Sequence, residues 1–444
     1  MKRNNIVYYG VILILLVLST GFLSNIQVNA HTENVVIILS YQGKDYKYNF
    51  DENLPKITNF WDSKKLQKNN RMANSNLRAD TIERIIEIGY TPLQAFDYML
   101  FGFEEFYNQV KAEIECQVSD AKIIFDTTKA NKFTIIEEKI GYTLNEEEIL
   151  NNIIQEMKKT SEVKVEIKPI LTLPKYTKKE LSTWTRKLSS FSTNYASSTE
   201  NRKHNVRTAL SKFDGMVVKP NEVVSFNTIT GRRTVENGYK EAKIIQDREY
   251  VEAFGGGVCQ SSTTLYNALI LAGVDIKEVH SHSLAPNYVE LGFDAMVNFG
   301  TSDLKFMNAS DTPIFIHTKY TDQSVIVEIY GKPKDNYIRK RVSEVVEKIV
   351  PEPEKLIIDT EQEYTDKVLY EDEEWYKVYP KNGYKARGYI EYYQGDKLLN
   401  KKKIREVKYH AVCGIKVKGV KKRVIVEKKE ESLSNWNTLD KLLA

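Results

Sequence analysis

The chain has 444 residues, enough for two to four domains, and its 41% hydrophobic and 28% charged residues are typical of globular proteins. Its 64 basic and 60 acidic residues leave a net charge of +4, so the overall charge gives no reason to expect a nucleic-acid partner. Three cysteines, Cys116, Cys259 and Cys413, argue against a disulfide framework, because at least one thiol must stay free or pair between chains.

The N-terminus has the pattern of an export signal. Lys2 and Arg3 precede an apolar run over 6–22, and residues 28–30 provide the small side chains of a cleavage site. We therefore expect residues 1–30 to be a signal peptide, which places the remaining chain in the cell wall or in the medium. An uncleaved anchor is the alternative, because the run is close to the minimum length that spans a bilayer. It would hold the chain at the extracellular face of the cell membrane.

Residues 35–175 mix strand and helix patterns. They predict a hairpin over 34–50, helices at 81–88, 92–100 and 145–154, and strands at 121–126, 132–137 and 163–167. Through Asp126, the strand 133–135, Gly141 and the acidic last helix, this region resembles the peptidoglycan-binding domains that precede VanW modules. The resemblance implies a wall-binding role, and a plain spacer is the alternative.

A glycine turn leads into a predicted helix at 258–272. Gly255, Gly256 and Gly257 permit a tight turn, and the Ser, Thr, Leu and Ala residues after them suit a helix. Cys259 then lies at the positive end of the helix dipole, where the pKa of a thiol falls and backbone N–H groups are free to hold an oxyanion. The alternative is that Cys259 is a buried packing residue beside a closely packed turn.

Further motifs surround this turn between 185 and 333. They are Phe191-Ser192-Thr193, an amphipathic helix at 201–210, and the segments 217–227, 231–239 and 303–308. With the cysteine motif they are similar to the VanW family, named for an accessory protein of vancomycin-resistance clusters. One departure is Asn221, where a glycine usually follows the proline. The resemblance implies an exported, cell-wall-associated protein whose partner is peptidoglycan.

Two histidines follow the Cys259 helix. The pattern predicts a strand at 276–283, on which His280 and His282 project from the same face. A thiolate, an imidazole and a group that orients the imidazole form the arrangement of cysteine hydrolases and acyl transferases. Their order here is similar to that of transglutaminase-like and papain-like enzymes. The predicted triad is Cys259, His282 and Asp303, and its alternatives are His280 as the base and Asp294, Asn298 or Asn308 as the orienting group.

The histidines have two other interpretations. They form a satisfied polar pair at a strand edge, or they bind zinc with Cys259, for which a fourth ligand is lacking. We expect neither a metal nor a cofactor. The candidates for substrate contact are the turn glycines and nearby polar residues: Gly255, Gly256, Gly257, Gln260, Ser261, Arg202, Glu222, Arg232 and Arg233. The charged members equally suit surface ion pairs.

The rest of the chain is rich in strand patterns. Strands at 303–307, 314–318 and 325–331 predict an antiparallel sheet against the Cys259 helix. Residues 338–425 predict an all-β domain, which through Gly383, Gly388, Gly395, Gly414 and Gly419 resembles a G-five-type domain. That resemblance implies adhesion to wall glycan, and a β spacer is the alternative. Residues 426–444 form a charged tail. The predicted fold is multidomain α+β, and its domains are at 35–175, 185–333 and 338–425.

The sequence leaves two functions open. The first, which we expect, is an exported protein that binds peptidoglycan or its precursors without catalysis. The second is a cysteine-dependent amidase, peptidase or transpeptidase acting on peptidoglycan stem peptides. A depressed pKa of the Cys259 thiol favours the second, and an inert buried thiol favours the first.

Overall fold

In a computed structural model of the protein, residues 34–52, 75–100, 102–246 and 249–423 are described. The predicted signal segment 1–30 and the charged tail 426–444 lie outside these ranges. Within them, no helix combines the length and apolar character needed to cross a membrane. The chain divides into two compact units, one formed by 1–121 with 137–177 and the other by 122–136 with 178–444.

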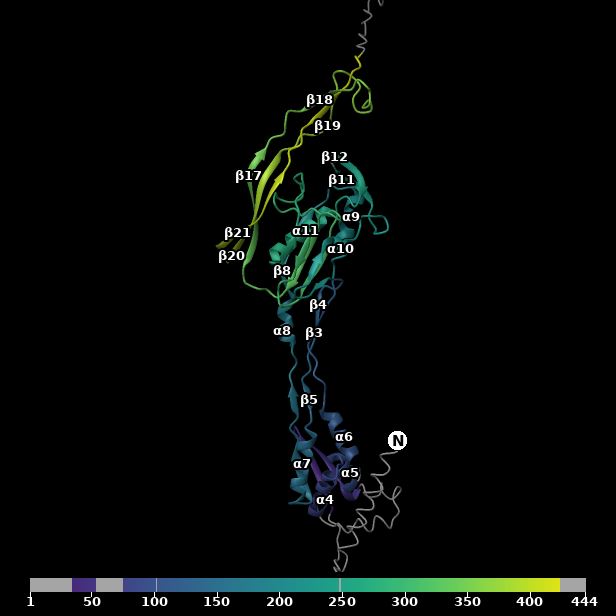
Figure 1. The fold of residues 1–444 in the computed structure, drawn as a ribbon, viewed down its shortest axis with the longest axis vertical. Helices are drawn as coiled ribbons and strands as arrows, with labels where there is room; N and C mark the ends of the chain where they lie inside the picture. The colour runs from purple at the N-terminus through teal and green to yellow at the C-terminus, as the bar shows by residue number, and fades with distance from the viewer. Residues whose placement is uncertain (1–33, 53–74, 101, 247–248, 424–444) are drawn as a thin grey trace, which may run out of the picture. The chain divides into compact units, whose positions relative to one another are not determined.

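The first unit packs helices against a small sheet (Figure 1). β1 (Val36–Tyr41) lies between β2 (Lys44–Asn49), to which it is antiparallel, and β6 (Glu162–Glu166), to which it is parallel. The helices are α4 (Ser75–Glu87), α5 (Pro92–Met99), α6 (Phe103–Ile114) and α7 (Glu146–Met157), and β5 (Gly141–Thr143) pairs with β7 (Ile170–Thr172). Side-chain oxygens of Thr91 and Asn145 cap α5 and α7, and the apolar faces of the helices share one core with β1.

α11 (Val258–Ala272) forms the centre of the second unit. Its residues from Gln260 to Leu269 are buried, and it packs on α9 (Glu200–Ser211) and on a four-stranded sheet. The sheet has the order β8-β16-β15-β9, with β8 (Arg186–Asn194), β9 (Val217–Val218), β15 (Ile314–Tyr320) and β16 (Ser324–Gly331). Leu265, Ala268 and Leu269 of α11 fill the core. The polar residues of its first half are therefore left to bond the surrounding chain.

Shorter elements surround α11. β14 (Lys305–Met307) pairs with β10 (Val223–Ser225) on one side and with β13 (Asp275–Glu278) on the other. The hairpin of β11 (Glu241–Gln246) and β12 (Glu249–Phe254) leads into the glycine turn, and α10 (Phe226–Thr230) follows β10. α8 (Lys178–Ser182), η1 (Thr183–Thr185) and the hairpin of β3 (Lys122–Phe125) and β4 (Phe133–Ile136) complete this part. Phe125 and Phe133 of that hairpin stack on each other and contact Phe315.

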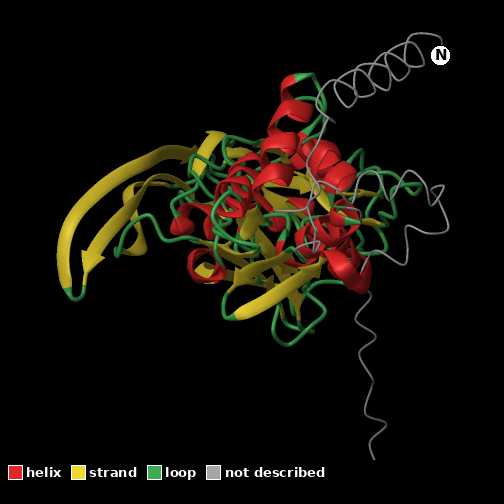
Figure 2. Cartoon of the chain, turned by 90° about the horizontal axis from the view of Figure 1, so that it is seen from below, coloured by secondary structure: helices red, strands yellow, loops and turns green. Residues whose placement is uncertain are grey.

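Long antiparallel strands follow in the same unit. β20 (Gly383–Gln394) lies between β17 (Ile338–Ile349) and β21 (Lys397–Tyr409). A smaller sheet has the order β18-β22-β19, with β18 (Lys355–Ile358), β19 (Glu374–Val378) and β22 (Ile415–Lys418). Helices and strands both make up large parts of the described chain (Figure 2), so the predicted multidomain α+β class is confirmed.

Two predicted details of the second unit are wrong. β14 does not join β15 and β16 in one sheet, because β10 and β13 pair with its two edges. The strand predicted at 276–283 ends at Glu278, so it does not carry His280 and His282 side by side. The hairpin at 122–136 packs with the second unit, and the predicted domain bounds stay predictions.

Candidate active site

The glycine turn places Cys259 at the second residue of α11. Gly255 and Gly257 have φ angles of +83° and +105°, which residues with side chains rarely adopt. A Cβ on Gly255 would lie 2.5 Å from Cγ of Arg233, and one on Gly257 would lie 2.9 Å from a methyl carbon of Val206. The turn needs glycine for its backbone and for close packing, and the predicted turn and helix are confirmed.

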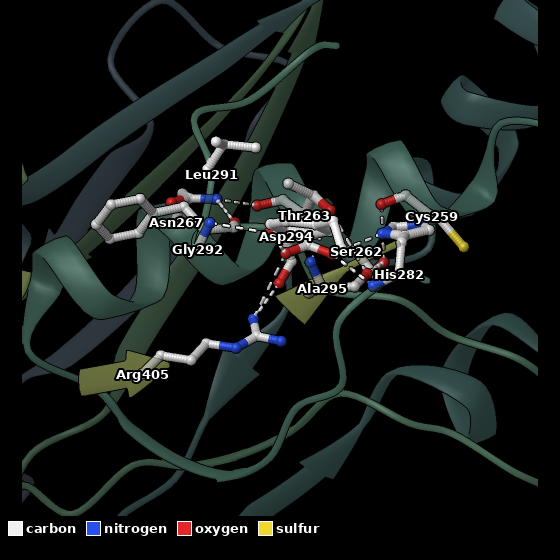
Figure 3. A network of polar contacts seen from close by, with 12 residues as sticks. Cys259, Ser262, Thr263, Asn267, His282, Leu291, Gly292, Asp294, Ala295 and Arg405 are labelled. Carbon is white, nitrogen blue, oxygen red and sulfur yellow. Dashed lines mark hydrogen bonds and ion pairs between the residues drawn. The ribbon is translucent and has the colours of Figure 1, made fainter. Parts of the chain in front are cut away.

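Polar residues of α11 hold the loop that carries Asp294. Ser262 Oγ donates to the carbonyl of Ala295 over 2.6 Å, and Thr263 Oγ1 accepts the amide of Ala295 over 2.9 Å. One turn later, Asn267 donates to a carbonyl of the same loop over 2.8 Å. Figure 3 shows Asp294 among these contacts, beside the helix. The polar half of α11 therefore fixes the position of a buried carboxylate.

Asp294 in turn holds His282. Its Oδ2 accepts the backbone amide and the ring Nδ1 of His282, each over 2.7 Å. The side chain of Asp294 is fully buried and that of His282 is 19% exposed. The imidazole of His282, held in this way by Asp294, acts on the thiol of Cys259 and lowers its pKa. Asp294, His282 and Cys259 are thus linked in this order.

These three side chains change one another's pKa values. Burial raises the pKa of the Cys259 thiol, but the hydrogen bond and charge of His282 bring it below its ordinary value. Burial lowers the pKa of His282, and its hydrogen bonds to Asp294 and Cys259 raise it above its ordinary value overall. Burial raises the pKa of Asp294, but the hydrogen bond from His282 and its charge bring that pKa below its ordinary value overall. Together these shifts favour a thiolate and imidazolium pair near neutral pH.

Three further groups surround the thiol. The Sγ atom of Cys259 lies 3.4 Å from the carbonyl oxygen of Val297. The positive charge of Arg233 helps to lower the pKa of the thiol. Tyr288 lies near the thiol, and burial and the charge of Cys259 raise the pKa of its hydroxyl well above the ordinary value. The sequence analysis missed Tyr288, because no motif or spacing relates it to Cys259.

This site lies inside a stretch that matches a known family. The family model for VanW like protein matches residues 201–330, which include Cys259, His282 and Asp294. The uncharacterized protein YoaR of Bacillus subtilis is 33% identical over 220 residues, which span 49% of this chain and 73% of that protein. The chain belongs to the VanW-like family.

A second relative and a solved structure match the chain less well. The vancomycin B-type resistance protein VanW of Enterococcus faecalis is 25% identical over 146 residues, which span 32% of this chain and 53% of that protein. The solved structure titled "Crystal structure of HP0197-G5" covers 19% of this chain and all of the solved chain, at 16% identity and a TM-score of 0.11. At that score the match assigns no fold to any part of the chain, and the G-five resemblance stays a prediction.

Two of the candidate residues lie apart from the thiol of this VanW-like domain. His280 Nε2 is 2.9 Å from Glu278, whereas His282 is bonded to Asp294, so the prediction that both histidines share one strand face is wrong. Asp303 accepts the hydroxyl of Ser225 and, over 2.9 Å, the amide of Asn227, which fixes the start of α10. The carboxylate at His282 is Asp294, the alternative in the sequence analysis.

Gln260 and Ser261 are buried and engaged in the fold. Gln260 Nε2 donates to the carbonyl of Asn194 over 2.8 Å, and its Oε1 accepts Arg202 over 2.8 Å. Ser261 Oγ donates to the carbonyl of Val206 over 3.0 Å. These contacts join α11 to β8 and α9, so Gln260, Ser261 and Arg202 act on the site through the position of the helix.

Glu222 and Arg232 are exposed. Glu222 Oε2 accepts the amide of Lys219 over 2.8 Å in a turn, and the guanidinium of Arg232 lies 5.0 Å from the ring centre of Phe299. Among the residues that the structure describes, no three or more His, Cys, Asp and Glu side chains gather in a way that could hold a metal ion. Arg233, unlike Arg232, is half-buried, and its guanidinium donates to the carbonyl of Gly231 and to Oδ1 of Asn227.

Proposed function

We propose that this VanW-like protein is a cysteine-dependent acyl-transfer enzyme that cleaves amide bonds in cell-wall peptides. One observation carries the proposal: Asp294 holds the imidazole of His282 over 2.7 Å, and that imidazole lowers the pKa of the Cys259 thiol at the start of a buried helix. Cysteine hydrolases and acyl transferases use these groups in this order. Cys259 is the nucleophile, His282 the acid and base, and Asp294 the group that orients the imidazole.

In the first half-reaction, the thiolate of Cys259 attacks the carbonyl carbon of the amide and a carbon–sulfur bond forms. His282, which holds the proton at Nε2, gives it to the leaving amine as the carbon–nitrogen bond breaks. In this scheme the amide of Cys259, at the positive end of the α11 dipole, stabilises the intermediate oxyanion, and the positive charge of Arg233 assists it. The products are a thioester on Cys259 and a free amine.

In the second half-reaction, water or an amine attacks the thioester carbonyl. His282 accepts the proton of the attacking group as the carbon–sulfur bond breaks, which restores the thiolate and imidazolium pair. Attack by water makes the enzyme an amidase or peptidase, and attack by an amine makes it a transpeptidase. The same three residues serve both outcomes.

We place the substrate in the cell wall. The N-terminal sequence predicts export, and one relative is named a vancomycin B-type resistance protein. The wall binding that the sequence predicts for 35–175 and 338–425 then brings the enzyme to its substrate. Peptidoglycan binding and catalysis are in this way parts of one function.

The test is to trap the thioester. A chain with Cys116→Ala and Cys413→Ala is incubated with soluble peptidoglycan stem peptides, quenched in acid, digested and analysed by mass spectrometry. We expect an acyl adduct on the peptide that contains Cys259, together with the released amine. Adding Cys259→Ala removes both products. The parent with only Cys116 and Cys413 replaced is the matched control and keeps activity, because those two thiols bond the carbonyls of Ile140 and Pro353.

The outcome that contradicts the proposal is equally specific. If the stem peptides bind to the chain but are recovered intact, with no adduct on Cys259, the protein is a binder of wall peptides and not an enzyme. The buried glycine turn then serves packing alone.

A further inference from the structure

The loop between His282 and Asp294 is bonded to the long C-terminal strands as well as to α11. The amide of His410 donates to the carbonyl of Ser283 over 2.8 Å, and Ser343 Oγ donates to the carbonyl of Leu291 over 2.8 Å. Gly292 lies so close to β20 that a Cβ on it would be 3.1 Å from the amide nitrogen of Gly388. The loop that carries the candidate acid and base is therefore held between the helix and the sheet of β17, β20 and β21.

Tyr409, the last residue of β21, reaches the carboxylate itself. Its hydroxyl donates to Asp294 Oδ1 over 2.6 Å and accepts the amide of Gly292 over 2.9 Å. Tyr409 is fully buried, so water does not compete for these bonds. Because His282 occupies Oδ2 and Tyr409 occupies Oδ1, the carboxylate plane is fixed from both sides.

Arg405, four residues earlier on β21, contacts the same aspartate. Its Nη1 donates to the carbonyl of Asp294 and lies 4.0 Å from Oδ1, as Figure 3 shows. Its side chain is only 10% exposed, and its positive charge acts on the pKa of Tyr266 in α11. Arg405 thus ties the loop to the sheet at the point where Asp294 is held.

We propose that Tyr409 and Arg405 are positioning residues of the Cys259 site, so that the C-terminal sheet is a part of the active site in addition to any wall-binding role. This inference rests on the proposed function, because a positioning residue needs a site to position. It also goes beyond the family match, since the VanW model ends at residue 330 and both side chains come from β21. They act on the thiol through Asp294 and His282.

The direction in which the pKa of the Cys259 thiol moves when Tyr409 loses its hydroxyl distinguishes positioning from a simple charge effect. If Tyr409 acted only by drawing charge from Asp294, its removal would make the carboxylate a stronger acceptor. The imidazolium would gain stability, and the pKa of the Cys259 thiol would fall further. If Tyr409 holds the carboxylate in place, its removal lets Asp294 and His282 turn away from the thiol. The pKa of the thiol then rises toward its ordinary value of about 8.5.

The experiment measures the rate of Cys259 alkylation by iodoacetamide against pH in the full exported chain with Cys116→Ala and Cys413→Ala. Tyr409→Phe removes only the hydroxyl, and Arg405→Met removes the guanidinium. Tyr393→Phe and Arg387→Met are matched controls on β20, because Tyr393 bonds Glu391 and Arg387 bonds Glu406 instead of Asp294. We expect the midpoint of the profile to rise in both test variants and to stay in place in both controls.

A second measurement guards against variants that fold poorly. The proton on Nδ1 of His282, followed by NMR, gives a strongly downfield signal while it is bonded to Asp294, and we expect Tyr409→Phe to weaken or move it. A midpoint that is unchanged or lowered in a folded Tyr409→Phe chain overturns the inference and leaves the proposed function intact. An ordinary thiol midpoint in the parent chain overturns the proposed function, and the inference with it.

Discussion

The second unit contains two histidine–aspartate pairs built in the same way. Asp294 accepts Nδ1 of His282 over 2.7 Å, together with a backbone amide and the hydroxyl of Tyr409. Asp214, in the turn after α9, accepts Nδ1 of His317 over 2.8 Å, together with the amide of Thr318 and a threonine hydroxyl from the β3–β4 hairpin. In both pairs, hydrogen bonds lower the pKa of the carboxyl group against the opposing effect of burial.

What separates the two pairs is the third partner. Within the described chain, the thiols of Cys259, Cys116 and Cys413 all lie against backbone carbonyls, and His282 in addition lowers the pKa of Cys259. The His317 pair joins β15 to the hairpin of β3 and β4 and holds the fold. A buried imidazole with a carboxylate is therefore no evidence of catalysis alone, and the thiol beside it decides the chemistry.

The largest expected difference is in stability. The Asp294 carboxylate is fully buried and bonded to His282 and Tyr409, so Asp294→Ala leaves those two groups without their partner and costs about 3–5 kcal/mol of unfolding free energy. Asp214→Ala costs about 1–3 kcal/mol, because 29% of the Asp214 side chain is exposed. Urea unfolding followed by circular dichroism measures both, and equal losses would contradict the different burial of the two carboxylates.

The next effect concerns the thiol. His282→Ala removes the imidazole that lowers the pKa of Cys259, so the thiolate fraction near neutral pH falls. His317→Ala, the matched change in the other pair, leaves the thiol unaltered. Titration of the thiolate ultraviolet absorbance measures both variants. A change of similar size in His317→Ala would mean that general loss of structure, and not the loss of the imidazole, moves the thiol.

A smaller effect appears in the pH dependence of stability. Asp214 and Asp294 both have lowered pKa values in the folded protein, so their stabilisation is complete above the ordinary carboxyl pKa of about 3.9 and is lost as the pH falls through the folded values. Asp214→Asn removes one of these groups, so its urea midpoint declines less steeply in acid than that of the parent chain. A steeper decline in the variant would contradict the direction of the Asp214 shift.

The smallest change in stability is expected from substitutions of Glu222 and Arg232, two candidate residues that are exposed. Glu222→Gln and Arg232→Ala change the unfolding free energy by less than about 0.5 kcal/mol, because both side chains lie on the surface. Neither moves the pKa of Cys259. A turnover assay with stem peptides then shows whether either contacts substrate, and a rise in KM without a change in kcat would return it to the site.

Local chemistry explains what could be read from the sequence. Three glycines before a helix with a cysteine in its first turn are adjacent in the chain, so the turn, the helix and the thiol could be predicted together. The choice between Asp294 and Asp303 could not be made, because it depends on the path of a loop that Ser262 and Thr263 hold in place. No spacing rule indicates that path.

Partners that are distant in the sequence could not be predicted either, because their contacts also depend on the path of the folded chain. Tyr409 bonds Asp294 across 115 positions in sequence, from a strand that the sequence analysis assigned to a separate wall-binding domain. The strand β17 was not predicted at all, since its mixture of exposed and half-buried residues has no clean alternation. The contacts between this sheet and the loop that carries Asp294 could therefore be identified only from the structure.

The most direct test of the account is the alkylation rate of Cys259 against pH in the folded chain, with the other two cysteines replaced by alanine. A thiolate held by His282 reacts with an apparent pKa well below about 8.5, and it keeps most of its rate at neutral pH. A rate that follows an ordinary thiol pKa, or that begins only when urea unfolds the chain, would show that Cys259 is a packing residue.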